Sequence, residues 1–431
     1  MFSQSDLVQV YDKRGISGAQ QTKRSVVMIY PRIDPTLDGL KLEFMIPVPF
    51  LSIATKLVGK YDVDIIDARV EDNYMELIEQ AIRKNPVCVA LTCITGSHII
   101  NTLAVAKKIR EINPEIPIIW GGWHASLSPE QTLRNEYVDV VVDGQGEATF
   151  LDLVETLDNK TDLQNVAGLY YKKNGHVLKT AFREIEDINH FHPLPYQLID
   201  MNKYQNSAKT ISVHTSHGCP HRCSFCATKT VFRRRWTALT PEKVVDEVEF
   251  LVKTYGFTDI RFEDDNFFVD IHRVRKIADE IIRRNLNITW FGLTRAEYMK
   301  RMDDEYFALM KKSGCNKLLI GTESGSQEVL DYLQKDTDVE DNYTFIKRCK
   351  KHDIVGWHSF MVGLPNEPSD SLEKTFKLIK FVKETDARNE ILVFFYTPYP
   401  GNELWSEAIK YGFKPPQSLE EWADYNLTAV T

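Results

Sequence analysis

Three cysteines within eight residues are the clearest chemical signal in this chain of 431 residues. They are Cys219, Cys223 and Cys226, in the segment GCPHRCSFC. Three thiolates this close can hold three corners of one cuboidal iron–sulfur cluster and leave its fourth iron without a protein ligand. Such an open position allows a metal centre to bind a substrate. The alternative is a structural zinc site completed by His217 or His221, but zinc sites usually use two separated CxxC pairs, and this sequence has no second pair.

The cysteines follow the first strand of a series of strand–helix units that would position them. The expected strands are 211–218, 259–267, 287–295, 316–324, 355–363 and 390–398, and the clearest helices are 241–256 and 371–384. Thr240 is the expected N-cap of the first helix, with Pro241 at its first position. Six units predict a partial (β/α)6 barrel, whose active residues gather at the carboxyl ends of the strands.

Charged residues stand at two of these strand ends. Asp264 and Asp265 follow the second strand, and we expect their carboxylates to face a cationic ligand such as a sulfonium or an amino group. Arg295 ends the third strand and can bind a carboxylate through two parallel hydrogen bonds.

The cysteine motif, with the aromatic Phe225 before its last cysteine, resembles the defining motif of the radical S-adenosylmethionine (SAM) superfamily. The resemblance implies that SAM chelates the open iron of a 4Fe–4S cluster and that one electron cleaves it to a 5′-deoxyadenosyl radical. It also implies that Phe225, Glu323 and Ser324 contact SAM. The segments Gly363-Leu364-Pro365 and Tyr396–Gly401 resemble those of the cobalamin-dependent radical group, so Tyr396 joins the expected SAM contacts, although Asn366 and Asn402 depart from that pattern.

The first half of the chain alternates strands and helices as well. Strands are expected at 24–32, 62–68, 87–95, 116–122 and 138–144, and helices at 49–60, 74–85, 99–113 and 147–157. The strands are continuous apolar runs, which is typical of a parallel sheet buried on both faces. The sequence therefore predicts an α/β protein with an N-terminal doubly wound, Rossmann-like sheet. There is no GxGxxG after the first strand and no GxxxxGK[ST], which disfavours a dinucleotide or a nucleoside triphosphate.

This half resembles the cobalamin-binding domain that precedes many radical enzymes. Ligands of such sheets bind beyond the carboxyl ends of the strands. In the family, the loop Thr92–Ser97 and the Gly121-Gly122 pair make room for the nucleotide tail of cobalamin. Thr36 stands where mutases carry a cobalt-ligating histidine, so histidine is not expected below the cobalt. The expected cobalamin contacts are Thr36, Thr92, Thr95, Ser97, Gly121, Gly122, His124, Gly144, Gly146 and Glu147.

Two alternatives remain open for this half. The sheet could be a response-regulator-like or purely structural domain, because the signal is a domain pattern and not a metal motif. His124 could be a hydrogen-bonded structural residue at a strand end, which is the more common role of a lone histidine.

The expected domain boundaries follow from these patterns. Residues 1–23 form an N-terminal extension, 24–160 the cobalamin-binding domain, 161–210 a hairpin and linker, 211–412 the radical SAM barrel and 413–431 a C-terminal tail. The hairpin is expected around Asn174-Gly175. Many relatives carry a further domain over the barrel mouth, so the short tail suggests either a short form or a lid from elsewhere, such as the linker.

Composition and charge limit the classes of partner and the cellular locations that are expected. The formal net charge of −8 disfavours a nucleic-acid partner, and no apolar run is long enough to span a bilayer. The N-terminus lacks the apolar core of a secretion signal, and an odd number of cysteines, seven in a large chain, is not a disulfide framework, so a cytoplasmic location is expected. The short basic run Arg233–Arg235 could be a solvated turn or could lie near an anionic ligand or electron donor.

The expected function is a cobalamin-dependent radical SAM methyltransferase that methylates an unactivated carbon of a small molecule. An electron donor such as flavodoxin or ferredoxin is the expected partner. The alternatives are an enzyme with the same cofactors that catalyses a radical oxidation, cyclisation or ring rearrangement, and a non-catalytic iron–sulfur or cobalamin sensor. The motifs identify neither the substrate nor a catalytic residue.

Overall fold

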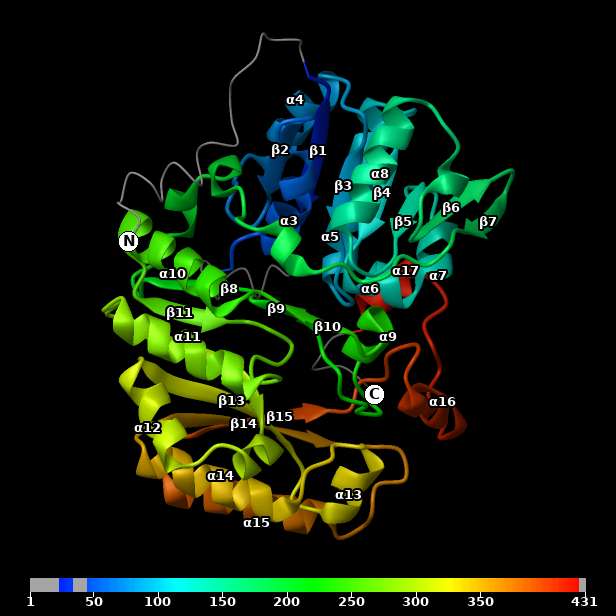
Figure 1. Ribbon diagram of the computed structural model, residues 1–431. Helices are drawn as coiled ribbons and strands as arrows, with labels where there is room; N and C mark the ends of the chain where they lie inside the picture. Colours follow the sequence, from blue (N-terminus) through cyan, green and yellow to red (C-terminus); the bar gives the residue numbers. More distant parts are fainter. Residues whose placement is uncertain (1–22, 34–44, 426–431) are drawn as a thin grey trace. The chain divides into compact units, whose positions relative to one another are not determined.

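The computed structural model describes residues 23–33 and 45–425, which form two compact units. The first unit comprises the chain up to Gln205 together with Pro416–Ala429, and the second comprises Asn206–Pro415. Each unit is built around one sheet (Figure 1). No helix among the described residues is long and apolar enough to cross a membrane.

The first unit contains a seven-stranded sheet in the order β2-β1-β3-β4-β5-β6-β7. The first five strands in this order run parallel, and β6 and β7 join antiparallel, so the hairpin expected near Asn174 extends this sheet. The strands are β1 (Ser25–Tyr30), β2 (Asp62–Asp67), β3 (Val89–Thr92), β4 (Ile118–Gly121), β5 (Val140–Val142), β6 (Leu169–Lys173) and β7 (His176–Lys179).

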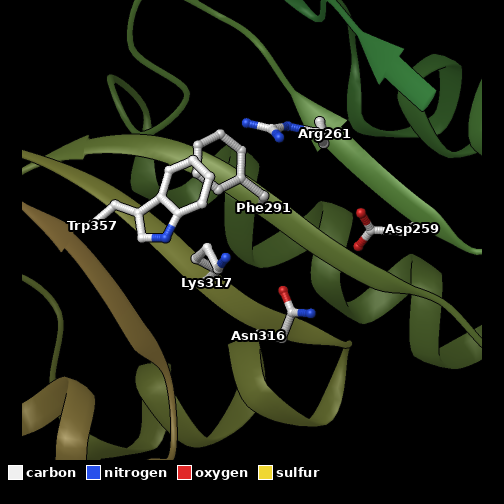
Figure 2. Close-up of a pocket in the computed structure, with 6 residues that line it drawn as sticks. All are labelled: Asp259, Arg261, Phe291, Asn316, Lys317 and Trp357. Atoms are coloured by element: carbon white, nitrogen blue, oxygen red, sulfur yellow. The ribbon is translucent and has the colours of Figure 1, made fainter. Parts of the chain in front are cut away.

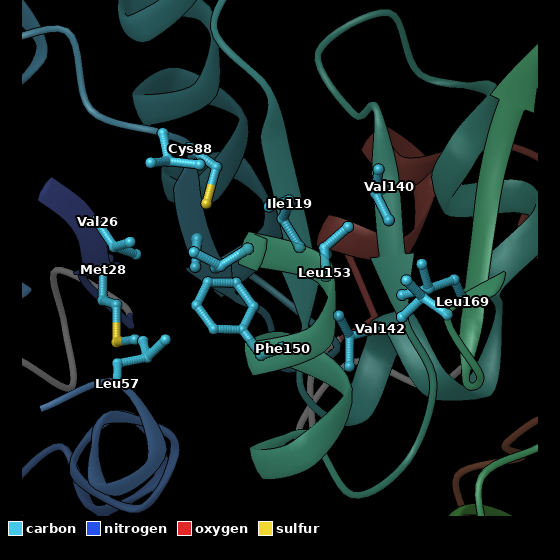
Figure 3. Packing of buried hydrophobic residues seen from close by; sticks show 14 of the residues in the cluster. Val26, Met28, Leu57, Cys88, Ile119, Val140, Val142, Phe150, Leu153 and Leu169 are labelled. Carbon is cyan, nitrogen blue, oxygen red and sulfur yellow. The ribbon is translucent and has the colours of Figure 1, made fainter. Parts of the chain in front are cut away.

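Helices cover both faces of this sheet, as a doubly wound fold requires. They are α3 (Val48–Leu57), α4 (Tyr74–Arg83), α5 (His98–Ile112), α6 (Trp123–Leu127), α7 (Pro129–Arg134), α8 (Glu147–Asp158) and α17 (Leu419–Ala423). Alternate residues of β1, such as Val26 and Met28, pack with Leu57 of α3 and with Phe150 and Leu153 of α8 in one fully buried core (Figure 3). The predicted α/β order of this half is confirmed.

The second unit contains a six-stranded, all-parallel sheet in the order β15-β14-β13-β12-β11-β8. Its two edge strands do not pair with each other, so the predicted partial barrel is confirmed as an open one. The strands are β8 (Thr210–Val213), β11 (Asp259–Phe262), β12 (Thr289–Arg295), β13 (Cys315–Glu323), β14 (Val355–Val362) and β15 (Glu390–Phe395).

Helices follow these strands along the outer face. They are α10 (Pro241–Tyr255), α11 (Ile271–Arg283), α12 (Asp304–Lys312), α13 (Gln327–Tyr332), α14 (Val339–Lys351), α15 (Ser371–Thr385) and α16 (Glu403–Lys410). The Thr240 side chain accepts a hydrogen bond from Lys243 N and Pro241 occupies the first turn of α10, as the sequence predicts.

The strand expected at 211–218 is divided in two. β8 ends at Val213, and β9 (Ser216–Gly218) pairs antiparallel with β10 (Trp236–Ala238) in a separate ribbon. Gly218 allows this pairing, because its φ is +78° and a Cβ there would lie 2.3 Å from Arg235 O. The short helix α9 (Thr228–Phe232) follows the cysteines.

Candidate active site

The cysteine loop begins where β9 ends and is fixed by distant segments of the second unit. Ser224 N donates to Leu333 O (2.9 Å), and Ser224 Oγ donates to Tyr332 O (3.1 Å). From the other side, Asn402 Nδ2 donates to Phe225 O (2.9 Å). The loop backbone is thus held by groups about a hundred or more residues away in sequence.

The three cysteines of this loop are free thiols, with Cys223 buried and Cys219 and Cys226 half-buried. Burial raises the pKa of Cys219 to about 11 and also raises the pKa of Cys226. Metal binding requires the thiolates, so loading the site releases protons. Three soft sulfur donors in one loop suit an iron–sulfur cluster. No three His, Cys, Asp or Glu side chains in residues 23–33 and 45–425 are placed to hold a metal ion.

His221, one of the two possible zinc ligands, is already engaged. Its Nε2 lies 2.7 Å from Tyr298 Oη, and Asn266 Nδ2 donates to the same hydroxyl (2.8 Å). Burial is the largest cause that lowers the pKa of His221, to about 3. His221 therefore acts as a neutral partner of Tyr298 beside the cysteines.

Arg295 points at the cysteine loop. Its Nη1 donates to Cys223 Sγ (3.0 Å), its Nη2 donates to Lys335 O, and its Nε pairs with Glu297. The side chain is almost fully buried. The sequence predicts an arginine that binds a carboxylate through two hydrogen bonds, whereas in this structure its guanidinium contacts the Cys223 sulfur, the Lys335 carbonyl and the Glu297 carboxylate.

Glu323 and Lys335 form a buried ion pair close to this arginine. Lys335 Nζ lies 2.6 Å from Glu323 Oε1, and both side chains are less than a tenth exposed. Glu323 has a φ of +59°, an uncommon conformation for a non-glycine residue, at a register shift between β13 and β14. Gly321 leaves room for the pair, because a Cβ there would lie 2.6 Å from Lys335 Nζ.

Ser324 faces away from this pair. Its Oγ lies 3.0 Å from Thr375 Oγ1 on α15 and accepts a hydrogen bond from Ser326 N. Ser324 therefore links the end of β13 to helix α15.

The two aspartates after β11 accept hydrogen bonds from neighbouring segments of the second unit. Asp264 is fully buried, and its carboxylate accepts hydrogen bonds from Thr215 N, Thr215 Oγ1 and Ser216 Oγ, each at 2.6 Å. Asp265 accepts from Gly218 N (3.1 Å) and Thr228 Oγ1 (3.2 Å). Both carboxylates turn toward the neighbouring strand end because its N–H and hydroxyl donors lie within reach. Both carboxylates brace the base of the cysteine loop. Asp264 is buried and faces no open ligand position, whereas Asp265 is exposed, and its contact with a cationic ligand stays a prediction.

Phe225 and Tyr396 belong to a small apolar cluster with Leu333 and Leu364. Burial raises the pKa of Tyr396, whose hydroxyl has no hydrogen-bond partner among the described residues. A buried hydroxyl without a partner is costly, so Tyr396 is a candidate for contact with a ligand.

The carboxyl edge of the first sheet carries the second group of predicted residues. A Cβ on Gly121 would meet nothing within 4 Å, so the end of β4 is open. Gly122 is different: its φ is +90°, and a Cβ would lie 2.8 Å from Thr92 Oγ1. Gly121 therefore provides space, whereas Gly122 permits close approach between β3 and the turn after β4.

His124 lies just beyond these glycines and is buried. Its Nδ1 is 3.0 Å from Thr95 Oγ1, and its ring packs edge-on against Trp422 of α17 at 5.4 Å between centroids. Trp422 Nε1 donates in turn to Gln131 Oε1 (2.6 Å). Burial lowers the pKa of His124 to about 4, and its Nε2 has no partner in the described part of the chain.

The remaining predicted contacts on this edge serve local structure. Ser97 Oγ donates to Ile33 O, and Gly144 N donates to Ser126 Oγ. Glu147 is buried and accepts from Ser52 Oγ at 2.6 Å, joining α8 to α3. Gly146 precedes α8, and Thr36 lies outside the described residues.

Sequence reasoning missed Lys335, Tyr298 and Trp422. Lys335 and Tyr298 lie in no motif, and their roles depend on loops brought together by the fold. Trp422 stood in a segment expected to be a tail, where a single tryptophan among acidic residues gives little signal.

Two families match the sequence. The family described as the radical SAM superfamily matches residues 213–379, and the B12 binding domain matches residues 43–154. The first match covers the cysteine loop and most of the open barrel, and the second covers the edge that carries Gly121 and His124.

Two curated relatives cover most of the chain. An uncharacterized methyltransferase of Pyrococcus horikoshii is 33% identical over 368 residues, which are 84% of this chain and 78% of the relative. An anaerobic magnesium-protoporphyrin IX monomethyl ester cyclase of Rubrivivax gelatinosus is 32% identical over 376 residues, 84% of this chain and 65% of the cyclase. The chain thus spans less than two thirds of the cyclase.

A solved structure shares the fold. It is the radical SAM methyltransferase TsrM from Kitasatospora setae with cobalamin and a [4Fe-4S] cluster bound, with a TM-score of 0.76 and 16% sequence identity. The similarity covers 90% of this chain and 78% of that one.

Proposed function

This chain belongs to the radical SAM superfamily and carries a B12-binding domain, and on that premise we propose that it methylates an unactivated carbon of a small-molecule substrate. It is a cobalamin-dependent radical SAM enzyme, with a 4Fe–4S cluster, SAM and cobalamin as cofactors, and it requires a reductant. The observation that carries the methyl-transfer proposal is the 33% identity to an archaeal methyltransferase over 84% of the chain.

Cys219, Cys223 and Cys226 would hold three irons of the cluster. When the cofactors are bound, the cluster supplies the electron that cleaves SAM to a 5′-deoxyadenosyl radical, and cobalamin supplies the carrier for the methyl group. The chain's own part is to hold the thiols in place. Arg295 orients Cys223 through a hydrogen bond to its sulfur, and the donors to Ser224 and Phe225 fix the loop backbone.

Around the expected SAM position, Glu323 is the carboxylate best placed to accept a hydrogen bond. Lys335 fixes its orientation, and its second oxygen can accept from a ribose hydroxyl or an amino group. The unpartnered Tyr396 hydroxyl and the Phe225 ring would cover one side and exclude water. Asp264 is not among the proposed SAM contacts, because three internal donors already occupy its carboxylate.

At the first sheet, we propose that Gly121, Thr92, Thr95 and His124 contact cobalamin. The open space at Gly121 and the unpartnered Nε2 of His124 support this assignment, because the group of residues offers both room and an unused hydrogen-bonding atom.

The second candidate is a radical cyclisation or oxidation without methyl transfer. It is favoured by the 32% identity to an anaerobic cyclase over a comparable length. The sensor alternative is disfavoured by the family match and by the archaeal methyltransferase relative.

Anaerobic reconstitution followed by turnover tests the proposal. About four irons and one cobalt per chain are expected. Methyl transfer predicts a product heavier by one methyl group together with S-adenosylhomocysteine. A product of unchanged carbon count, formed with 5′-deoxyadenosine but without S-adenosylhomocysteine, would establish the second candidate instead.

We further propose flavodoxin or ferredoxin as the electron donor and a cytoplasmic location. The exposed turn at Arg233–Arg235 supports an acidic donor, since Arg234 Nε donates to Pro220 O (3.2 Å) and so places this basic turn beside the cysteine loop. Cysteines that are free thiols before a cluster is loaded also suit a reducing compartment.

A further inference from the structure

The inner face of the open barrel carries a second polar and aromatic group, at the end opposite the cysteines. A pocket, here called the floor pocket, is lined by Asp259, Arg261, Phe291, Asn316, Lys317 and Trp357 (Figure 2). Its residues stand near the amino ends of β11, β12, β13 and β14. On β12, Phe291 precedes Arg295 by four residues, a separation of about 13 Å along a strand. The floor pocket is therefore distinct from the cysteine site.

Two cations contact one indole in this pocket. The Arg261 guanidinium lies 5.4 Å from the Trp357 ring centroid and 4.6 Å from that of Phe291. Lys317 Nζ lies 4.1 Å from the Trp357 centroid, and the two aromatic rings are 5.4 Å apart. Cations over aromatic faces are attracted to them, so these four side chains hold one another in position.

The acidic side chains near the pocket already have hydrogen-bond or ion-pair partners. Asp259 accepts hydrogen bonds from the Thr210 and Thr289 hydroxyls (3.0 and 2.6 Å). Glu263 pairs with Arg261 at 2.9 Å. Within the part of the chain that the structure describes, Lys317 pairs with Glu390 at 3.4 Å, and the Glu390 side chain is half exposed. The Lys317 ammonium, with three protons to donate, therefore keeps unused capacity toward the pocket.

Trp357 carries the strongest indication of a ligand. Its Nε1 is buried and has no hydrogen-bond partner among the described residues. A buried N–H without an acceptor is costly, and such groups in native proteins usually have a partner. The indole N–H, the Lys317 ammonium and the Asn316 amide line one pocket and together can serve an acceptor with two oxygens and one negative charge. A phosphate fits less well, because its second charge would lie near Asp259 and Glu263.

We propose that the floor pocket binds the carboxylate of an organic acid through Trp357 Nε1 and Lys317. The acid is either the far end of the substrate itself, which would then be an elongated molecule reaching toward the cysteines, or a separate small acid. The binding site does not depend on the radical reaction, whereas the choice between these two sources rests on the proposed function.

Titration of the reconstituted enzyme with benzoate, followed by calorimetry, tests the site. We expect saturable binding with a Kd on the order of 1 mM or below. Benzamide, which lacks the charge, should bind more weakly. Trp357→Phe keeps the ring but removes the N–H, and Lys317→Met removes the charge, and each should weaken benzoate by about fivefold to tenfold. Lys377→Met, on the exposed face of α15, is the matched control and should leave binding unchanged.

Thermal unfolding shows whether the variants fold. Absence of saturable benzoate binding in the wild type, or binding that survives both substitutions in folded protein, overturns the proposal. Formation of 5′-deoxyadenosine without substrate is measured on the same samples, so that failure of the radical function is recognised separately.

Perdeuterated decanoate distinguishes the two sources. If the pocket holds the end of the substrate, the extended chain reaches the radical, a C–D bond breaks, and deuterium appears in 5′-deoxyadenosine while the chain carbon keeps the unpaired electron. Perdeuterated benzoate is too short and should give none. Benzoate and decanoate binding that is sensitive to Trp357→Phe, without deuterium transfer from either, identifies the site as one for a separate acid.

Discussion

The cysteine loop of the second unit and the carboxyl edge of the first sheet are organised in opposite ways. At the cysteine loop, hydrogen bonds from distant segments hold Ser224, Phe225 and Cys223 in place. At the sheet edge, Gly121 borders open space and His124 Nε2 lacks a partner among the described residues.

The chemistry of the two cofactors explains this difference. A cluster depends on protein thiolates for its position, so those thiolates must be fixed in advance. Cobalamin brings its own corrin ligands to cobalt, so the protein has to supply shape and a few polar contacts. The cysteine loop is ordered because the protein itself provides the ligands of the cluster. The sheet edge can be more open because the corrin ring provides the ligands of cobalt.

Loss of one cluster ligand should separate the two regions most sharply. Cys223→Ala should reduce iron from about four per chain to a small remainder and abolish 5′-deoxyadenosine formation. Cobalamin binding, measured by its absorption spectrum after gel filtration, should persist because the sheet edge does not use this loop. Cys315→Ala, a buried strand cysteine, is the control and should keep its iron. Loss of cobalamin in Cys223→Ala would contradict the separation.

Breaking the buried ion pair between Glu323 and Lys335 tests how much this pair contributes to the stability of the second unit. Lys335→Met leaves the Glu323 carboxylate buried without a partner, and it should lower the free energy of unfolding by about 3–5 kcal/mol. The double variant Glu323→Gln with Lys335→Met should recover part of this loss. Lys377→Met, whose pair with Glu373 is exposed, should change the free energy of unfolding by less than about 0.5 kcal/mol. Chemical denaturation of the three variants provides the measurement, and equal effects of the two lysine substitutions would refute the argument.

Substitutions of the adjacent Gly121 and Gly122 test the carboxyl edge of the first sheet. Gly122→Ala places a Cβ against Thr92 in a left-handed backbone conformation and should lower the free energy of unfolding by about 1–3 kcal/mol. Gly121→Ala meets no atom and should leave stability unchanged, yet it should raise the Kd for cobalamin about tenfold if the cofactor fills that space. An unchanged cobalamin Kd in Gly121→Ala would remove Gly121 from the site.

The smallest expected effect concerns Arg295. Its hydrogen bond to Cys223 should stabilise the reduced, more negative cluster, so Arg295→Lys should make the reduction potential more negative by about 60 mV, a tenfold change in equilibrium. Redox titration followed by electron paramagnetic resonance gives the value. Arg222→Lys, in the same loop but paired with exposed Asp336, should shift it much less. Equal shifts in the two variants would contradict a role for the Arg295–Cys223 hydrogen bond in setting the potential.

The sequence predicted the element types well because both units follow local periodicity. Strands such as β3 and β13 are continuous or alternating apolar runs, and Thr240 with Pro241 marks a helix start by local chemistry. The partner of a strand is less predictable. The hairpin β6–β7 has a clear turn signal, but nothing local indicates that β6 pairs with β5.

Side-chain direction at the strand ends was the least predictable feature. Asp264 and Arg295 have the residue types that bind SAM, yet one turns to Thr215 and the other to Cys223. Each direction is set by donors or acceptors supplied by loops distant in sequence, such as Lys335 O for Arg295. A residue type at a strand end therefore identifies a chemical capacity, and the fold decides what uses it.

The return of the chain to the first unit has a consequence for biosynthesis. Trp422, which packs against His124, is translated only after the whole of residues 206–415. At about 5–20 residues per second, the ribosome needs tens of seconds to make that stretch. The first sheet can form its strands well before then, but its carboxyl edge lacks the α17 helix throughout. The packing of Trp422 against His124 can therefore form only late in the synthesis of the chain.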